Sequence, residues 1–295
     1  MLVVGEALID VVERASGPRD EHVGGSPANV ALGLARLGIP TRLRTAIGRD
    51  GWDERIERHL AASGVDVDVE SRSLETTSSA TASISESGSA TYDFSIDWVL
   101  EEPIELRDAG IVHVGSIACF IEPGASELLR WIQALPMSIT LTFDPNIRPA
   151  LVGERTRAVA ITELLASRAD VVKLSDEDAA WLYPELALDD VLDRLLSRGA
   201  RVTAVTKGRE GASIGSAEAR VDVNSRRVHV ADTIGAGDTF MAVLVAQLAE
   251  GRLSSRPSSL ARAGELAALA ASMTVSRVGA ALPDRAELER AASDL

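Results

Sequence analysis

Apolar and polar positions follow one another along this chain in a rhythm that predicts an α/β fold. Short apolar runs, which are typical of buried strands, are separated by longer stretches whose apolar residues have helical spacing. After Pro103 the alternation is regular, and it predicts a mostly parallel sheet with helices on both faces. The predicted strands here are Ile111–Val114, Ile139–Phe143, Val171–Leu174 and Val202–Thr206, and the predicted helices lie near residues 124–135, 154–167 and 188–198.

The first sixty residues begin with a strand and continue with helices. Leu2–Asp10 is interpreted as one buried strand that ends in a carboxylate. A helix is predicted from about Ser26, because Pro27 lies in its first turn and Gly38 follows its last apolar residue. Residues 41–47 are expected to form a strand and residues 52–63 a helix.

Residues 76–98 have a different residue pattern from the rest of the chain. Small polar residues alternate on both sides of Ser87–Ser89, which predicts a hairpin of two strands. Such a hairpin has little core of its own, so we expect it to cover something. With residues 11–23 it is expected to form a small β lid on a single domain that spans residues 1–295.

The strongest chemical signal is the segment Asp232–Asp238, which reads Asp-Thr-Ile-Gly-Ala-Gly-Asp. A glycine-rich turn precedes a helix, so backbone N–H groups and the positive end of the helix can approach an anion. Asp238 lies in the first helical turn, next to any group that reacts with that anion. The alternative is an ordinary turn capped by Asp238. The segment is neither a P-loop nor a dinucleotide fingerprint.

Two further segments could carry chemistry. Gly24–Asn29 places paired glycines before a helix, where the backbone can approach a ligand, although a simple loop with Asn29 as a cap is the alternative. Gly211–Gly215 has the Gly-x-Ser-x-Gly spacing of a hydrolase elbow around Ser213. That elbow needs a helix after the serine, and short strands are predicted there instead.

The glycine-rich segments at the two ends of the chain together resemble the paired signatures of the ribokinase-like sugar kinases, also called the phosphofructokinase B family. The resemblance covers essentially the whole chain. It implies a ribokinase-like fold and transfer of a phosphoryl group from ATP, with Mg²⁺, to a sugar hydroxyl. A requirement for K⁺ is left open.

The resemblance also implies roles for individual residues. Asp238 is the expected catalytic base, and the expected anion hole is formed by Gly235, Ala236 and Gly237. The residues expected to bind the sugar are Asp10, Gly25, Ser26, Asn29 and Arg148. The residues expected to bind the nucleotide are Lys173, Ser175, Thr206, Lys207 and Gly208, together with Gly235 and Gly237. Lys173 and Lys207 are the only lysines, and both fall at predicted strand ends.

One motif of the family is altered in this chain. Ser175–Asp178 falls where the family has Asn-x-x-Glu, a motif linked to magnesium and phosphate. Asp178 is therefore expected to have an indirect link to the metal, and the neighbouring Glu177 could take that role instead.

Within the family, Phe143–Pro149 resembles fructokinases and 2-keto-3-deoxygluconate kinases. Fructose is the expected substrate because residues 76–98 contain no Arg or Lys to meet a carboxylate. The ketoacid, with Arg148 as its partner, is the first alternative, and a nucleoside is a weaker one. A sugar sensor without catalysis is also possible in principle, but it would not need Asp238.

Charge and cysteine content limit the possible partners of the protein and its expected cellular compartment. The 295 residues carry a net charge of −14, which argues against nucleic acid or an anionic membrane as a partner. The positive potential that holds any bound phosphate must therefore come from a local arrangement of residues. A single cysteine, Cys119, and a start without a basic leader predict a cytoplasmic protein. A homodimer that forms through the lid is expected from the resemblance.

Overall fold

The computed structural model describes residues 1–14, 19–85, 90–100 and 104–294. Its largest element is a nine-stranded sheet in which neighbours are parallel, except that β12 is antiparallel to both of its neighbours. In spatial order the strands are β13 (Arg220–Val223), β12 (Ala212–Ser216), β11 (Val202–Thr206), β10 (Val171–Ser175), β9 (Thr140–Asp144), β8 (Ile111–Gly115), β1 (Leu2–Val4), β4 (Thr41–Arg44) and β5 (Val65–Val67). The predicted α/β fold with a mostly parallel sheet is confirmed.

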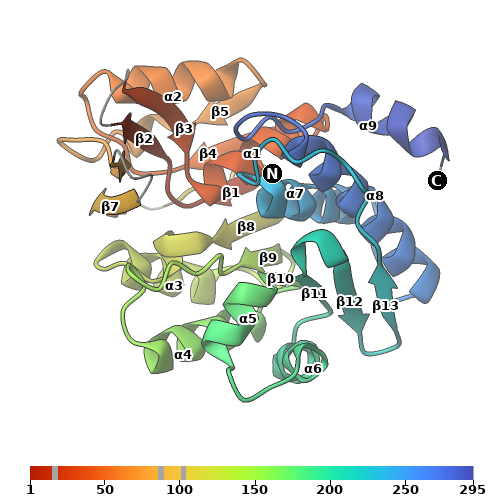
Figure 1. Cartoon of the computed structure of the whole chain (residues 1–295). Coiled ribbons are helices and arrows are strands. Elements are labelled where there is room, and N and C mark those ends of the chain that lie inside the picture. The colour runs from red at the N-terminus through yellow and green to blue at the C-terminus, as the bar shows by residue number, and fades with distance from the viewer. Residues whose placement is uncertain (15–18, 86–89, 101–103, 295) are drawn as a thin grey trace.

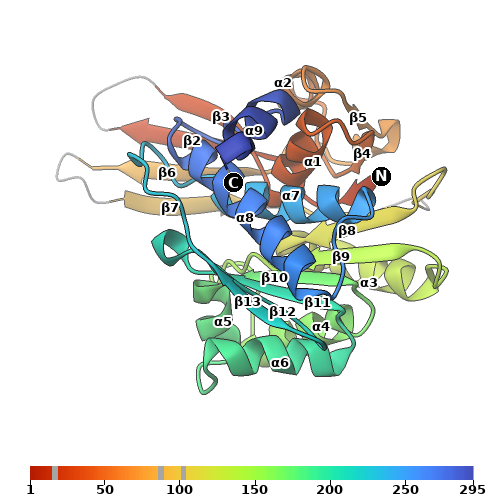
Figure 2. The ribbon, with the colours of Figure 1, turned by 90° about the vertical axis from the view of Figure 1, so that its right-hand side faces the viewer.

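Helices cover both faces of this sheet (Figures 1 and 2). One face is covered by α1 (Ser26–Arg36), α7 (Ala236–Ala249) and α8 (Pro257–Val275), and the other by α3 (Gly124–Ala134), α4 (Arg155–Ala166), α5 (Asp176–Leu182) and α6 (Leu188–Arg198). Two more helices, α2 (Trp52–Ala61) and α9 (Arg285–Ala291), lie at the periphery. Neighbouring strand residues serve opposite faces, so that Val171 belongs to one core cluster and Val172 to the other. No helix within the described residues is long and apolar enough to cross a membrane.

A second, four-stranded sheet projects from one edge of the molecule (Figure 2). Its strands are, in order, β3 (Asp20–Gly24), β2 (Leu8–Arg14), β6 (Ser79–Ile84) and β7 (Ala90–Ser95). These strands come from the two segments that the sequence assigns to a lid. The predicted turn at residues 87–89 and part of residues 11–23 lie outside the described residues.

The prediction of one continuous strand over Leu2–Asp10 is wrong. The chain leaves the large sheet after β1, and β2 starts in the small sheet. The break occurs at Gly5, where a Cβ atom would lie 2.3 Å from the Pro27 ring. Two residues later the Ala7 N–H donates to Thr45 Oγ1 instead of to a strand. This bend carries Asp10 out of the large sheet. The short elements α5 and β5 were not predicted, because each follows its neighbour within a few residues.

The order of the strands fixes where a ligand can bind. From β1 the chain moves outward to β4 and β5, and it then returns to the other side of β1 as β8. In open α/β sheets such a switch point opens a crevice at the carboxyl ends of the strands. Gly5–Ala7, the turn η2 (Ser116–Cys119) and Asp144 lie at these ends.

The contact between α1 and α7 aligns the helices above this crevice. Gly33 makes it possible, because a Cβ atom there would lie 2.8 Å from Ala242 Cβ and 2.6 Å from Leu282 Cδ2. We expect Gly33→Val to force the helices apart and to lower the free energy of unfolding by about 1–3 kcal/mol, measured by urea denaturation. The control is Gly110→Val, at a glycine with no atom near its Cβ position. An equal loss of stability in both variants would contradict this account.

Candidate active site

Asp238 lies at the start of α7, where the glycine-rich segment predicted it. Gly235 has φ +75 and begins the helix, a conformation that favours glycine. The Asp238 carboxylate is buried, and it accepts hydrogen bonds from Ser26 Oγ at 2.6 Å and Asn29 Nδ2 at 2.8 Å. Burial raises the pKa of Asp238, while the two donors act in the opposite direction. The two signature segments, 209 residues apart, thus meet at one carboxylate.

Lys173 supplies a positive charge beneath the glycine turn. It lies within β10, not after it, and its ammonium is almost fully buried. A Cβ atom on Gly237 would lie 3.0 Å from Lys173 Nζ, so the ammonium and the exposed backbone of the turn are neighbours. Lys173 Nζ also forms an ion pair of 2.9 Å with Asp144 Oδ2, at the end of β9.

The charges around Lys173 are strongly coupled. Burial lowers the pKa of Lys173, but the carboxylates of Asp144, Asp178 and Asp238 raise it by more, and the ammonium stays charged. Burial raises the pKa of Asp144 to about 6, against the pull of Lys173. The result at neutral pH is an ion pair that leaves a positive group next to Gly237.

A second group of residues lies close to Asp238. Asp10 in β2 is so close to Gly24 that a Cβ atom there would lie 2.0 Å from Asp10 Oδ2. Burial raises the pKa of Asp10 to about 6, the Arg148 guanidinium opposes this shift, and the Asp238 carboxylate adds to it. Gly25, with φ +101, lies against the carbonyl of Glu6. The predicted sugar-binding residues therefore surround the same carboxylate.

Asn146 follows a predicted strand and lies in the Phe143–Pro149 motif, but the sequence analysis assigned it no role. Its Oδ1 accepts from Arg148 Nη1 at 2.8 Å, and its Nδ2 donates to Asp238 Oδ1 at 3.5 Å. Asn146 has φ +36, a backbone conformation that asparagine tolerates better than most residues. The amide side chain therefore connects Arg148 with Asp238.

Glu6 is a further residue that the sequence analysis missed. It is buried after β1, and its Oε2 accepts from the Ala118 N–H at 3.2 Å in the turn η2. Burial raises the pKa of Glu6 to about 7. A carboxylate directly after a strand was the available signal, but Glu6 fell inside the strand predicted over Leu2–Asp10.

The predicted nucleotide residues lie along adjacent strand ends. Ser175 at the end of β10 pairs in register with Thr206 at the end of β11. Lys207 follows, with Nζ 2.9 Å from Ser213 Oγ and 3.1 Å from Asp222 Oδ1. Gly208 has φ +51 and nothing near its Cβ position, so its surroundings are open.

Ser213 is not arranged as a hydrolase nucleophile. It lies inside β12, and β13 follows, so the strand–turn–helix of the elbow does not form. Its hydroxyl donates to Asp222, which also receives Lys207. The structure therefore agrees with the expectation that Gly211–Gly215 has the spacing of a hydrolase elbow but does not form one.

Asp178 is occupied by hydrogen bonds to the backbone. Its Oδ2 accepts from the Ser175 N–H at 2.9 Å, while Ser175 Oγ accepts from the Asp178 N–H, which forms a capping box for α5. Its Oδ1 accepts from the Ile147 N–H at 2.7 Å. Asp178 thus holds the loop of Asn146 in place, and Glu177 beside it is exposed. Its indirect link to a metal stays a prediction.

Comparison with known proteins agrees with this arrangement. Residues 1–287 match the sequence profile of the pfkB family carbohydrate kinases. A fructokinase from Rhizobium leguminosarum bv. trifolii is 34% identical over 259 residues, which are 84% of this chain and 79% of that protein. A fructokinase from Salmonella typhimurium is 29% identical over 299 residues, 98% of this chain and 97% of that protein.

Solved structures show the same fold. The fructokinase with bound ATP from Xylella fastidiosa superposes with a TM-score of 0.82 at 26% identity, and the match covers 100% of this chain and 98% of that one. A sugar kinase from Pyrococcus horikoshii in complex with ATP gives a TM-score of 0.80 at 27% identity, over 100% and 99% of the two chains. This chain belongs to the pfkB family and is a carbohydrate kinase with the ribokinase-like fold.

The buried ion pair makes a prediction about stability. Lys173→Met strips Asp144 of its partner, so we expect a loss of about 3–5 kcal/mol at pH 8. Without Lys173 the pKa of Asp144 rises further above its value in the unfolded chain. The penalty is therefore full at high pH and shrinks as the pH falls and the carboxyl protonates.

Urea denaturation at pH 8 and pH 5 measures this effect. The control is Lys173→Met with Asp144→Asn, which removes both charges and should recover part of the stability at pH 8. Equal losses at the two pH values, or a double variant less stable than Lys173→Met alone, would contradict the buried pair.

Proposed function

We propose that this carbohydrate kinase transfers the γ-phosphoryl group of ATP to the primary hydroxyl of a ketohexose, converting fructose to fructose 6-phosphate. One observation carries the proposal. A buried carboxylate, Asp238, follows a glycine turn that has the Lys173 ammonium beside it, and it lies within electrostatic reach of Asp10 and Arg148. Phosphoryl transfer needs little beyond such positioning and charge stabilisation.

Asp238 is the proposed general base. A primary hydroxyl is a poor nucleophile until its proton is removed, and a positioned base contributes typically ~10²–10⁴-fold. Ser26 and Asn29 hold the carboxylate in place and favour its ionised form, while its burial strengthens it as a base. A sensor of the same fold would have no use for this base.

The phosphate side is assigned to the glycine turn and Lys173. The N–H groups of Gly235, Ala236 and Gly237 lie at the start of α7, where the helix dipole favours an anion. The ammonium of Lys173 adds a full charge next to Gly237. Ser175, Thr206, Lys207 and Gly208 are proposed to contact the nucleotide along the neighbouring strand ends.

Magnesium fits this site as a companion of the nucleotide. Among the described residues no group of three or more His, Cys, Asp or Glu side chains could hold a metal. Magnesium commonly keeps several waters and binds through substrate phosphates with one or two carboxylates. Of the acids near the site, Asp178 and Glu177 are proposed for this role; both Asp178 oxygens accept from backbone N–H groups, which leaves Asp178 an indirect part. A bound Mg²⁺ would neutralise charge on the phosphates.

The charge of the small sheet favours a neutral sugar. The described part of residues 76–98 carries Asp93 and Asp97 and no cation. In the other lid segment, Arg14 is paired with Asp20, and Arg19 with Glu21. A 2-keto-3-deoxygluconate carboxylate would therefore depend on Arg148, which keeps that ketoacid as the second candidate. The fructokinases among the relatives support fructose.

A homodimer that forms through the lid stays a prediction. Two aromatic rings support it, since Tyr92 is 67% exposed and stacks on Phe94 with 6.3 Å between ring centroids. Both lie on β7, an edge strand of the small sheet.

A substrate panel tests the proposed function. We expect kcat/KM to be highest for fructose when ADP release is compared for fructose, 2-keto-3-deoxygluconate, ribose and adenosine at matched ATP and Mg²⁺. The assays are run with and without K⁺. A preference for the ketoacid by more than about tenfold, ~1.4 kcal/mol of discrimination, would replace fructose as the substrate.

The base is tested by Asp238→Asn, which keeps the shape but cannot accept the proton. We expect kcat to fall by at least ~10²-fold, while the Kd of ADP changes little. The control is Asp66→Asn, at an exposed carboxylate on the edge strand β5, outside the proposed sugar and nucleotide residues. An Asp238→Asn variant that kept most of its turnover would remove Asp238 from the mechanism.

A further inference from the structure

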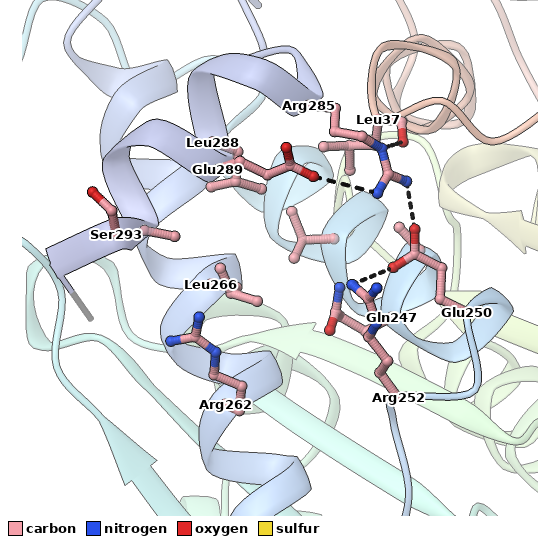
Figure 3. Close-up of a pocket in the computed structure, with 13 residues that line it drawn as sticks. Leu37, Gln247, Glu250, Arg252, Arg262, Leu266, Arg285, Leu288, Glu289 and Ser293 are labelled. Atoms are coloured by element: carbon pink, nitrogen blue, oxygen red, sulfur yellow. Dashed lines mark hydrogen bonds and ion pairs between the residues drawn. The ribbon is translucent and has the colours of Figure 1, made fainter.

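A hollow of about 200 Å³ lies at the opposite end of α7 from Asp238. It is open on one side and is lined by the last turns of α7, the middle of α8, the helix α9 and the end of α1 (Figure 3). The 14 residues of α7 span ~21 Å, so this hollow is separate from the catalytic crevice. Its volume equals that of roughly six or seven water molecules, which suits a small organic molecule.

The floor of the hollow is apolar and one of its rims is ionic. Aliphatic side chains form the floor, among them Val243, Leu266 and Leu288. On the rim, Glu250 is paired with Arg285 and, at 2.9 Å, with Arg252. Because the charged groups of that rim already pair with one another, they leave few hydrogen-bonding positions for a ligand.

The opposite side of the hollow carries two polar side chains without a partner among the described residues, Arg262, which is exposed, and Gln247, which is half-buried. Within the part of the chain that the structure describes, neither the Arg262 guanidinium nor the Gln247 side-chain amide has a hydrogen bond or ion pair. Arg262 projects from α8 and Gln247 from α7, with Leu266 between them in Figure 3. The lining has three arginines and two glutamates, a net charge of +1 in a chain of net charge −14.

The hollow is joined to the phosphate-binding turn through α9. Arg277 Nη2 lies 2.9 Å from Glu287 Oε1 of α9, so an ion pair connects the start of the segment 277–284 to this helix. The same segment touches the turn twice, since the Gly279 N–H donates to Asp232 Oδ2 at 3.0 Å and Ala280 lies against Gly235. A molecule that braces α9 against α7 also braces this contact.

We propose that the hollow between α7, α8 and α9 binds a small monocarboxylate with an apolar body, and that its binding steadies the segment 277–284 against the phosphate-binding turn. The apolar floor takes the hydrocarbon part. The carboxylate meets the fork of Arg262, the geometry in which guanidinium and carboxylate pair most strongly, and accepts from the amide of Gln247.

The first test uses hexanoate as the probe and the whole chain without substrate. Ligand-observed NMR should show saturable binding of hexanoate, and hexanamide, which lacks the charge, should bind about tenfold more weakly. Arg262→Gln should weaken hexanoate binding by a similar factor, and Ala292→Phe, which fills the hollow, should abolish it. The control Arg130→Gln removes an exposed arginine on α3 and should leave binding unchanged.

Three results would overturn the site: no saturable binding, equal binding of hexanoate and hexanamide, or equal binding by Arg262→Gln and the unchanged chain. Amide hydrogen exchange tests the coupling. Hexanoate should slow exchange in residues 277–284 of the unchanged chain and not in Ala292→Phe. Binding without slower exchange would overturn the coupling. Neither measurement uses a sugar or ATP, so both outcomes are independent of the proposed substrate.

Discussion

The close packing of α1 on α7 is the contact on which the site depends. Gly33 lets the two helices approach, and their first turns then bring Ser26 and Asn29 to the Asp238 carboxylate. Because both helices begin at this point, the positive ends of two helix dipoles converge on one crevice. An acidic chain thereby concentrates positive potential where an anion has to be held.

The buried charges of the site are held in place by a series of contacts, each of which depends on the one before it. Lys173 stands at the centre of a parallel strand, where a lone ammonium would be costly, and Asp144 on the next strand neutralises it. Asp178 in turn holds the loop after β9 through the Ile147 N–H. Asn146, whose backbone that loop bends into a left-handed conformation, can then reach both Arg148 and Asp238. A substitution of Lys173, Asp144, Asp178 or Asn146 is therefore expected to alter the surroundings of the Asp238 carboxylate.

Much of the fold and the chemical centre could be predicted from the sequence, because both rest on local patterns. β11 was predicted with its observed bounds, and the helix that starts after the glycine turn, with Asp238 in its first turn, was predicted from the motif. The predictions failed where long-range contacts decide the local structure. Leu2–Asp10 has the apolar pattern of one strand, but the chain leaves the large sheet at Gly5, where only a residue without a Cβ atom fits beside the Pro27 ring. Three features depend on tertiary packing and cannot be predicted from hydrophobic periodicity. They are the burial of Lys173, the contacts of Asn146 with Arg148 and Asp238, and the hollow beside α9.

The scarcity of lysine has a practical consequence for chemical modification. The sequence has two lysine ε-amines that an amine-reactive reagent could modify, Lys173 and Lys207. The ammonium of Lys173 is buried in its ion pair. Lys207, with a side chain 20% exposed, is the accessible ε-amine beside the nucleotide strands. Among the lysines, acylation would thus place a label or a crosslinker at Lys207, on one edge of the crevice, without any engineered cysteine.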